Sequence, residues 1–143
     1  TSGIIGIRTA VKTADETINN SNVLQDDDHI SISIEANARY AFRLVMRLSS
    51  KAASDFQFVF TIPSLADMLG ALTNEADTNS EINFASTMTI LVGSSSTRIH
   101  RRIGVLTTST NAGTVLLRWA QNVAAIEDTI LHAGSYLILE RLA

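Results

Sequence analysis

The sequence predicts an all-β fold, an antiparallel β-sandwich or jelly roll of about eight strands. Apolar and polar residues alternate with a period of two in several stretches, which places successive side chains on opposite faces of a strand. Turn-forming residues separate these stretches roughly every 8–12 residues. No strand–helix–strand rhythm is present, which argues against a parallel α/β fold. An eight-stranded barrel is the structural alternative.

The clearest alternation lies in the first half of the chain. Residues 29–36 carry isoleucine at every second position. Residues 40–48 carry Tyr, Phe, Leu, Met and Leu in the same way, and residues 56–62 carry three phenylalanines and an isoleucine before Pro63, the only proline. These patterns predict three consecutive strands, each with one apolar face.

The second half repeats this style. Strands are predicted at residues 84–92, 99–108, 114–122 and 136–142. The second of these contains Gly104, and a glycine inside a strand often marks a bulge or the close approach of another backbone. Nearly every residue of the last stretch is apolar, so we expect both faces of that strand to be covered.

One stretch departs from the β pattern. Residues 64–72 place leucine and methionine side chains at helical spacing behind Ser64, a residue type that can cap a helix. The spacing predicts one short helix near residues 64–72, and a closing loop is the alternative. Residues 73–83 are polar and are predicted to form an exposed excursion.

The bulk composition favours contacts with other proteins. The 143 residues fit a single domain, which we expect at residues 10–143 behind an N-terminal arm at residues 1–9. Charged residues make up 17%, against a usual share of about 25%, and coverage of the surface by other subunits is one explanation. The net charge of −3 gives no general attraction to nucleic acid. No run approaches the roughly 18 apolar residues of a membrane span, so we expect no membrane contact.

Residues for catalysis and metal binding are sparse. Cysteine is absent, which excludes disulfides, thiolate metal sites and cysteine nucleophiles. His29, His100 and His132 lie in separate segments and lack the spacing of a local ligand pair. No G-x-S-x-G elbow and no glycine-rich phosphate loop occur. We therefore expect no enzyme activity, no metal site and no cofactor.

The acidic run Asp26-Asp27-Asp28, followed by His29, is a candidate cation site because hard oxygen ligands stand beside an imidazole. Adjacent residues in an extended segment point in alternate directions, so three consecutive carboxylates seldom converge on one ion. The interpretation that we favour is a solvated turn leading into the strand that begins near Ile30.

A basic cluster and a single tryptophan complete the candidates. The basic cluster consists of Arg98, His100, Arg101 and Arg102. Its positive charge could prevent incorrect pairing of an exposed edge strand, or the cluster could face an acidic neighbouring protein. A nucleic-acid patch is less well supported because aromatic residues are not interleaved. Trp119 is expected in the core, with exposed sugar stacking as the alternative. The candidate partner contacts are Arg98, Arg101 and Arg102 in the cluster and Ile4, Ile5 and Ile7 in the arm.

Short segments between residues 11 and 141 carry a family resemblance. They are VKTADET at 11–17, Asn20, LQDD at 24–27, Ile30, ANARY at 36–40, GVL at 104–106, AGT at 112–114, WAQN at 119–122 and GSYL at 134–137. Their order and spacing resemble a domain common in tailed-bacteriophage structural proteins. Residues 1–8 and 65–83 depart from the family's pattern.

The resemblance implies a β-sandwich or jelly-roll subunit, usually a homotrimer, displayed on a virion. Members of this family are capsid decoration (cement) proteins or parts of tail and head fibres. A chain without a long shaft favours a decoration protein, located on the capsid exterior, that binds as a trimer across junctions of the major capsid protein and stabilises the head. The alternative is a receptor-binding or fibre domain that recognises a host cell-surface glycan.

Overall fold

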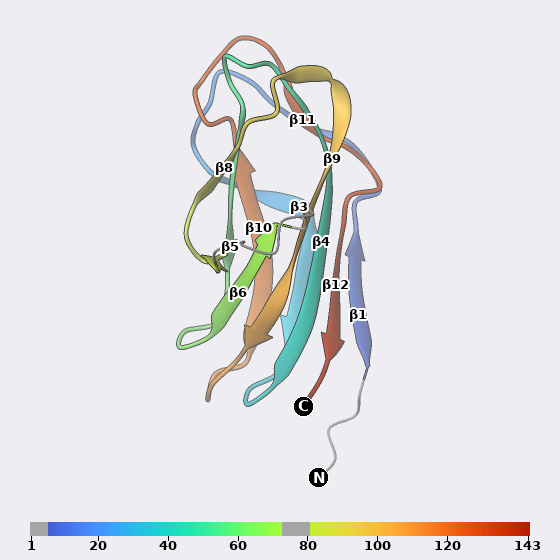
Figure 1. Cartoon of the computed structure of the whole chain (residues 1–143), viewed down its shortest axis with the longest axis vertical. Coiled ribbons are helices and arrows are strands. Elements are labelled where there is room, and N and C mark those ends of the chain that lie inside the picture. The colour runs from blue at the N-terminus through green and yellow to red at the C-terminus, as the bar shows by residue number, and fades with distance from the viewer. Residues whose placement is uncertain (1–5, 73–80) are drawn as a thin grey trace.

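The computed structural model describes residues 6–72 and 81–143, which form two antiparallel sheets packed face to face (Figure 1). The strands are β1 (Ile7–Val11), β2 (Glu16–Ile18), β3 (Gln25–Ile34), β4 (Arg39–Ser50), β5 (Phe56–Thr61), β6 (Asp67–Leu72), β7 (Ile82–Asn83), β8 (Met88–Ile90), β9 (Ser94–Thr107), β10 (Gly113–Ala120), β11 (Thr129–Leu131) and β12 (Tyr136–Arg141). The predicted all-β sandwich is confirmed.

The strand order is that of a jelly roll. The larger sheet has the order β1-β12-β4-β9-β6-β7, with β11 joining β4 to β2, and the smaller sheet has the order β3-β10-β5-β8. The pairs β1·β12, β3·β10, β4·β9 and β5·β8 join early strands to late strands in reverse order. The chain is thus folded back on itself as a long hairpin and then rolled into two sheets.

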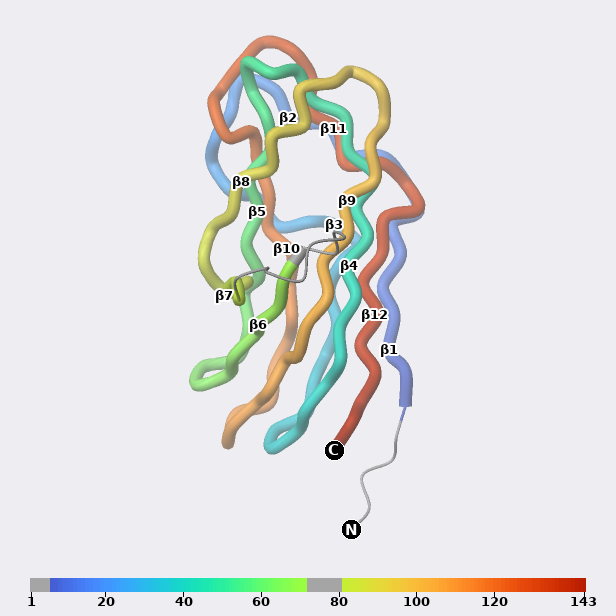
Figure 2. Tube along the Cα trace, in the orientation of Figure 1, coloured from blue at the N-terminus to red at the C-terminus, as the bar shows by residue number. Residues whose placement is uncertain are grey.

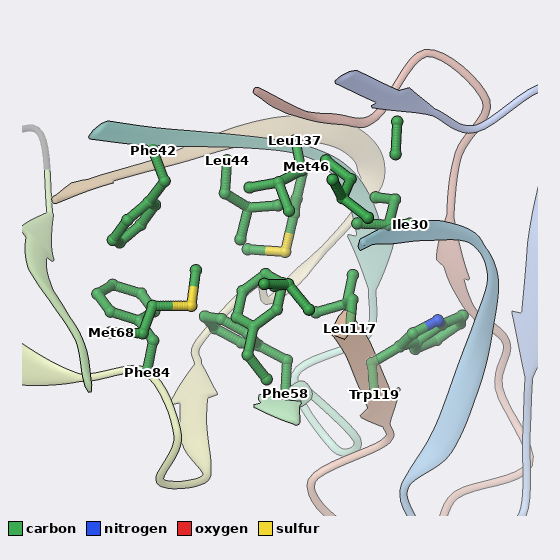
Figure 3. Close-up of a cluster of buried hydrophobic side chains, with 14 of the residues drawn as sticks. Ile30, Phe42, Leu44, Met46, Phe58, Met68, Phe84, Leu117, Trp119 and Leu137 are labelled. Carbon is green, nitrogen blue, oxygen red and sulfur yellow. The ribbon is translucent and has the colours of Figure 1, made fainter. Parts of the chain in front are cut away.

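The core lies between the two sheets and is built from the predicted alternating faces. Ile30 of β3, Leu44 of β4, Phe58 of β5 and Leu137 of β12 point toward one another (Figure 3). Trp119 of β10 is fully buried and stacks on Phe56, with ring centroids 5.4 Å apart. The expectation that Trp119 fills the core is therefore confirmed.

The helix predicted near residues 64–72 is absent, and a turn leads instead into β6, which pairs with β9. Gly70 lies opposite Gly104, and a Cβ atom on Gly104 would come within 2.1 Å of the Leu69 carbonyl oxygen. The two glycines allow the backbones of β6 and β9 to approach closely, as expected for Gly104, and the resulting strand pairing is favoured over the helix that the side-chain spacing predicts. The described residues form no helix, and hence none able to cross a membrane.

The two segments that depart from the family's pattern are only partly described. Residues 1–5, with Ile4 and Ile5, and residues 73–80 lie outside the described residues. Of the remaining residues of the predicted arm, 6–9, residues 7–9 belong to β1, which pairs with β12. The Arg8 guanidinium donates hydrogen bonds to the Ser33 carbonyl oxygen at 2.6 Å and to Glu35 Oε1 at 2.7 Å, which ties β1 to β3 and its following turn.

Candidate functional site

A buried ion cluster lies where residue 12, just after β1, meets β2, β3 and β10. Lys12 is 1% exposed. Its ammonium group donates hydrogen bonds to Glu16 Oε1 at 2.5 Å and to Asp27 Oδ1 at 2.7 Å, and lies 3.2 Å from His29 Nδ1. A buried ammonium group is stable only when it is paired and hydrogen-bonded, so these contacts are what allow Lys12 to be buried.

Asp27 is the centre of this cluster. Its Oδ1 also accepts a hydrogen bond from Trp119 Nε1 at 3.2 Å, and its Oδ2 accepts the backbone N–H groups of His29 at 3.0 Å and Ile30 at 2.7 Å. Burial by itself raises the pKa of Asp27. The hydrogen bond from Lys12, the two backbone donors and the charge of Lys12 outweigh burial, so the pKa lies below its ordinary value.

The three aspartates of the acidic run have different environments. Asp26 lies 3.2 Å from the Arg118 guanidinium, Asp27 is buried, and Asp28 is exposed. The run belongs to β3, so the solvated-turn interpretation is wrong for Asp27. Oxygen and nitrogen atoms of Glu16, Asp27 and His29 lie within 4.8 Å of one another, a spacing compatible with a cation. The Lys12 ammonium pairs with both carboxylates and supplies one positive charge at this place, so the cluster forms an ion-pair network.

Four of the segments that carry the family resemblance meet at this cluster. Lys12 comes from residues 11–17, Asp27 from residues 24–27 and Trp119 from residues 119–122. Residues 134–137 join through the backbone, since Gly134 N–H donates to the Lys12 carbonyl at 2.9 Å and Lys12 N–H donates to the Ser135 carbonyl at 2.8 Å. The motif residues therefore hold distant parts of the chain together rather than forming an open site.

A Ser–His–Asp chain of contacts lies at the end of the larger sheet that is far from the two termini. Ser49 Oγ is 2.9 Å from His132 Nε2, and His132 Nδ1 is 3.3 Å from Asp15 Oδ2, an order found in hydrolase triads. A hollow of about 350 Å³ borders Ser49. However, Ser49 is only 6% exposed, and Thr97 Oγ1 lies 3.3 Å from the same Nε2 atom. Because two hydroxyls share one imidazole nitrogen, we interpret the chain of contacts as a structural link.

The outer face of the larger sheet is the candidate protein-binding surface. We define the outer face as the side chains of β1, β12, β4, β9 and β6 that point away from the smaller sheet; these strands lie side by side in Figure 2. The strand registers arrange it in rows: Ile7–Glu140–Ala41–Val105–Leu69, Thr9–Ile138–Arg43–Ile103–Ala71, Val11–Tyr136–Val45–Arg101 and Arg47–Ile99. These rows combine large aliphatic side chains with arginines.

Several aliphatic side chains of the outer face are open to water, whereas Val45 is only 7% exposed. Ile7 is 67% exposed, Ile99 is 65% exposed and Ile103 is 46% exposed. An antiparallel sheet with one solvated face usually carries polar residues on that face. Ile138 of β12 is half-buried here, while Leu137 and its inward neighbours are fully covered. The described chain therefore covers one face of β12 fully and the other face only in part.

The predicted basic cluster is divided by the alternation of β9. Arg101 belongs to the outer face and is exposed, whereas Arg102 points inward opposite Leu44 and is 9% exposed. Burial lowers the pKa of Arg102 to about 10. Arg98, opposite the inward Leu48, is exposed where the sandwich ends. Burial removes Arg102 from the candidate partner contacts, and Arg98 and Arg101 do not share a face.

A hollow of about 420 Å³ lies in the middle of the outer face. It is lined by Ala41, Phe42, Arg43, Ile103, Gly104, Val105, Ile138 and Glu140. The floor is low because Ala41 has a short side chain, and Gly104 contributes only backbone there because its Cα faces inward, opposite Phe42. Isoleucine and valine side chains form the walls, with one positive and one negative group at the border. Such a depression can receive one apolar side chain of a partner.

No family model matches this sequence, and no curated protein matches it. Among solved structures, the chain is similar to the structure of infectious bursal disease virus Gx strain, with 9% identity and a TM-score of 0.31. The similarity covers 99% of this chain and 41% of that chain. It is also similar to a structure of the Gt strain, with 9% identity, a TM-score of 0.29 and coverage of 96% and 41%. A VP2 subviral particle of this virus gives 10% identity, a TM-score of 0.28 and coverage of 96% and 40%. The chain thus spans about two fifths of these viral chains, and similarity at this level carries no argument about function.

Proposed function

We propose that this chain is a non-enzymatic structural protein of a virion, a capsid decoration protein. In this proposal it binds as a homotrimer across junctions between major capsid protein subunits on the capsid exterior and stabilises the head. The observation that carries the proposal is the outer face, a sheet surface with aliphatic side chains open to water. The virion setting is what the family resemblance adds.

The physical task would be to add buried surface across capsomer boundaries. A ligand that binds only the assembled state stabilises that state by mass action, in proportion to the logarithm of its concentration over its Kd. The apolar residues of the outer face would supply most of the binding free energy at roughly 25 cal/mol per Å² of apolar area, before the cost of association is subtracted. A head under internal pressure would then open at a higher temperature.

The buried polar groups support a role without catalysis. The Lys12 ammonium is paired with both carboxylates of its cluster, and Ser49 is nearly inaccessible. A second set of hydroxyls, formed by Ser50, Ser54 and Thr129, is also buried, with Ser50 Oγ 2.7 Å from Thr129 Oγ1. These groups stabilise the fold by bonding to one another.

The glycan-binding alternative receives less support from the aromatic residues. Recognition of sugars commonly uses exposed aromatic rings, whose apolar faces contact the sugar. The sequence has five Phe, two Tyr and one Trp. Seven of these residues are buried in the structure, and Tyr136 is half-buried on β12. A glycan array with clear hits would nevertheless favour the receptor-binding role over the decoration role.

The proposal is tested with heads that lack this protein. The purified chain should bind expanded empty heads of the parent phage, and virions depleted of it should lose DNA at a lower temperature than complete virions. Sedimentation of the free chain should report a trimer. Absence of binding to expanded heads, or equal heat stability of depleted and complete virions, would reject the decoration role.

A further inference from the structure

The seam between β4 and β9 on the outer face has a regular composition. Three consecutive cross-strand pairs each combine one arginine with one aliphatic residue: Arg43 with Ile103, Val45 with Arg101, and Arg47 with Ile99. The arginines therefore alternate between the two strands along the seam. Long arginine side chains can lie along the aliphatic groups while their guanidinium groups remain in water. The seam presents apolar area and positive charge to the same partner.

The three pairs of the seam carry Arg43, Arg47 and Arg101 and no acidic residue, although the chain has a net charge of −3. Arg43 and Arg101 form no ion pair with any residue of 6–72 or 81–143. By contrast, Arg8, Arg118 and Arg141, away from this seam, each pair with a carboxylate. Guanidinium groups at an interface gain most from bidentate pairing with carboxylates. The charge pattern of the seam is therefore complementary to an acidic surface.

We infer that the outer face docks a partner protein whose contact surface carries an aliphatic side chain beside carboxylate groups. The aliphatic side chain would fill the hollow over Ala41 and Gly104, and the carboxylates would pair with Arg43 and Arg101. The inference rests on the proposed function in one respect. The proposed function identifies the partner on the outer face as the capsid protein and not as another copy of this chain.

Charge distinguishes this partner from the other occupants. Two copies packed by a two-fold axis through the seam would bring Arg43 and Arg101 of both copies together, and like charges at an interface cost free energy. A phosphate backbone would match the arginines but would leave Ile99 and Ile103 exposed. An acidic protein surface with an apolar centre satisfies both properties of the seam.

The outer face is large enough for this role. Its five strands span about 20 Å at roughly 4.8 Å per strand gap, and its rows from Ile99 to Val105 run about 20 Å along β9 at roughly 3.4 Å per residue. The resulting area is on the order of 400 Å², which increases when side-chain relief is included. One partner in a standard-size interface buries about 800 Å². The outer face can therefore form about half of one side of such an interface.

Charge reversal with a matched control tests the assignment. Arg43→Glu and Arg101→Glu should each weaken binding to expanded heads by about tenfold or more, because each removes a pairing group and adds repulsion. Arg98→Glu, on the same strand but outside the outer face, should stay within about twofold of the unaltered chain. Circular dichroism and melting curves establish that all three variants fold, and sedimentation should show the same oligomer for each.

The outcomes separate the inference from the proposed function. If the unaltered chain binds heads and Arg43→Glu binds equally well, the inference is wrong and the decoration role stands. Loss of the trimer in Arg43→Glu or Arg101→Glu would assign the outer face to a second copy. Equal loss in the Arg98 and Arg101 variants would point to general charge attraction rather than this face.

A small probe tests the inference without heads. Octanoate combines an aliphatic chain with a carboxylate, and octylammonium carries the same chain with the opposite charge. In NMR titrations, octanoate at millimolar concentration should shift the amide signals of Ile103, Val105 and Ile138, and Arg43→Glu should abolish these shifts. Octylammonium should have little effect. Equal shifts by both probes, or octanoate shifts confined to residues outside the hollow, would overturn the inference even if no head binds the chain.

Discussion

Replacing Lys12 with methionine removes the only ammonium group of the buried cluster while keeping a side chain of similar length. Asp27 then retains the Trp119 donor and two backbone donors but has lost its counter-charge. Removing one partner of a buried ion pair typically costs about 3–5 kcal/mol. For a chain of this length, such a loss lowers Tm by roughly 10–15 °C. We expect Lys12→Met to fall within this range at pH 7.

The pH dependence provides an independent check. The pKa of Asp27 is lowered in the folded chain, so its stabilising contribution is present above its ordinary value of 3.8 and is lost as pH falls through the folded pKa. In Lys12→Met the lowering influence of Lys12 disappears and burial, which raises the pKa, remains. Protonation of Asp27 then relieves the unpaired charge. The stability difference between the two proteins should therefore shrink between pH 7 and pH 4.

Urea denaturation followed by far-UV circular dichroism at both pH values measures this effect. Lys51→Met is the matched control, because Lys51 is the other lysine of the chain and is exposed. It should change the free energy of unfolding by no more than about 0.5 kcal/mol. Adding Asp27→Asn to Lys12→Met should recover part of the loss. A loss below about 1 kcal/mol for Lys12→Met, or a double variant less stable than the single one, would refute the reasoning.

Three further predictions concern other positions. Gly104→Ala should cost about 3 kcal/mol or more in urea denaturation, because the new methyl group would overlap backbone atoms of β6, whereas Gly6→Ala, which has open space, should be nearly neutral. Arg102→Met should raise the free energy of unfolding by about 1 kcal/mol at pH 7, because burial disfavours the guanidinium charge. The pKa of Arg102 in the folded chain, about 10, lies below its ordinary value of 12.5, so the guanidinium loses its charge above pH 10. The stability gain should therefore shrink above pH 10. A fluorophosphonate probe, followed by mass spectrometry, should leave Ser49 unlabelled, and labelling that disappears in His132→Ala would reveal a nucleophile.

The sequence predicts the strands wherever one face of a strand is buried. Phe56, Phe58 and Phe60 show this, because the burial of every second side chain leaves a signal within one short segment. The prediction of a helix at residues 64–72 was wrong. The helical spacing is visible within this one segment, whereas the pairing of Gly70 with Gly104, which decides the structure, joins residues far apart in the chain. A choice between helix and strand that depends on such a distant partner leaves no local pattern.

The candidate sites were harder to predict for the same reason. A single lysine in a polar segment carries no sign of burial, and Lys12 is buried only because Asp27 and Glu16 meet it in the fold. Arg101 and Arg102 are adjacent in the sequence, but the pleat of β9 sends them to opposite faces. Only the apolar composition of both faces of β12 indicated in the sequence that a second face of this strand could be covered. It did not indicate which surface would cover that face.

The nested strand pairing has a consequence for synthesis on the ribosome. β4 lies between β12 and β9, two strands that are made much later, and β1 pairs only with β12 within the described sheet order. The backbone groups on either edge of β4 cannot pair with another strand until most of the chain has left the ribosome. Contacts between residues so far apart in the chain make folding slow. The growing chain therefore exposes unpaired apolar strands for most of its translation. Expression at low temperature or with co-produced chaperones should raise the yield of folded protein.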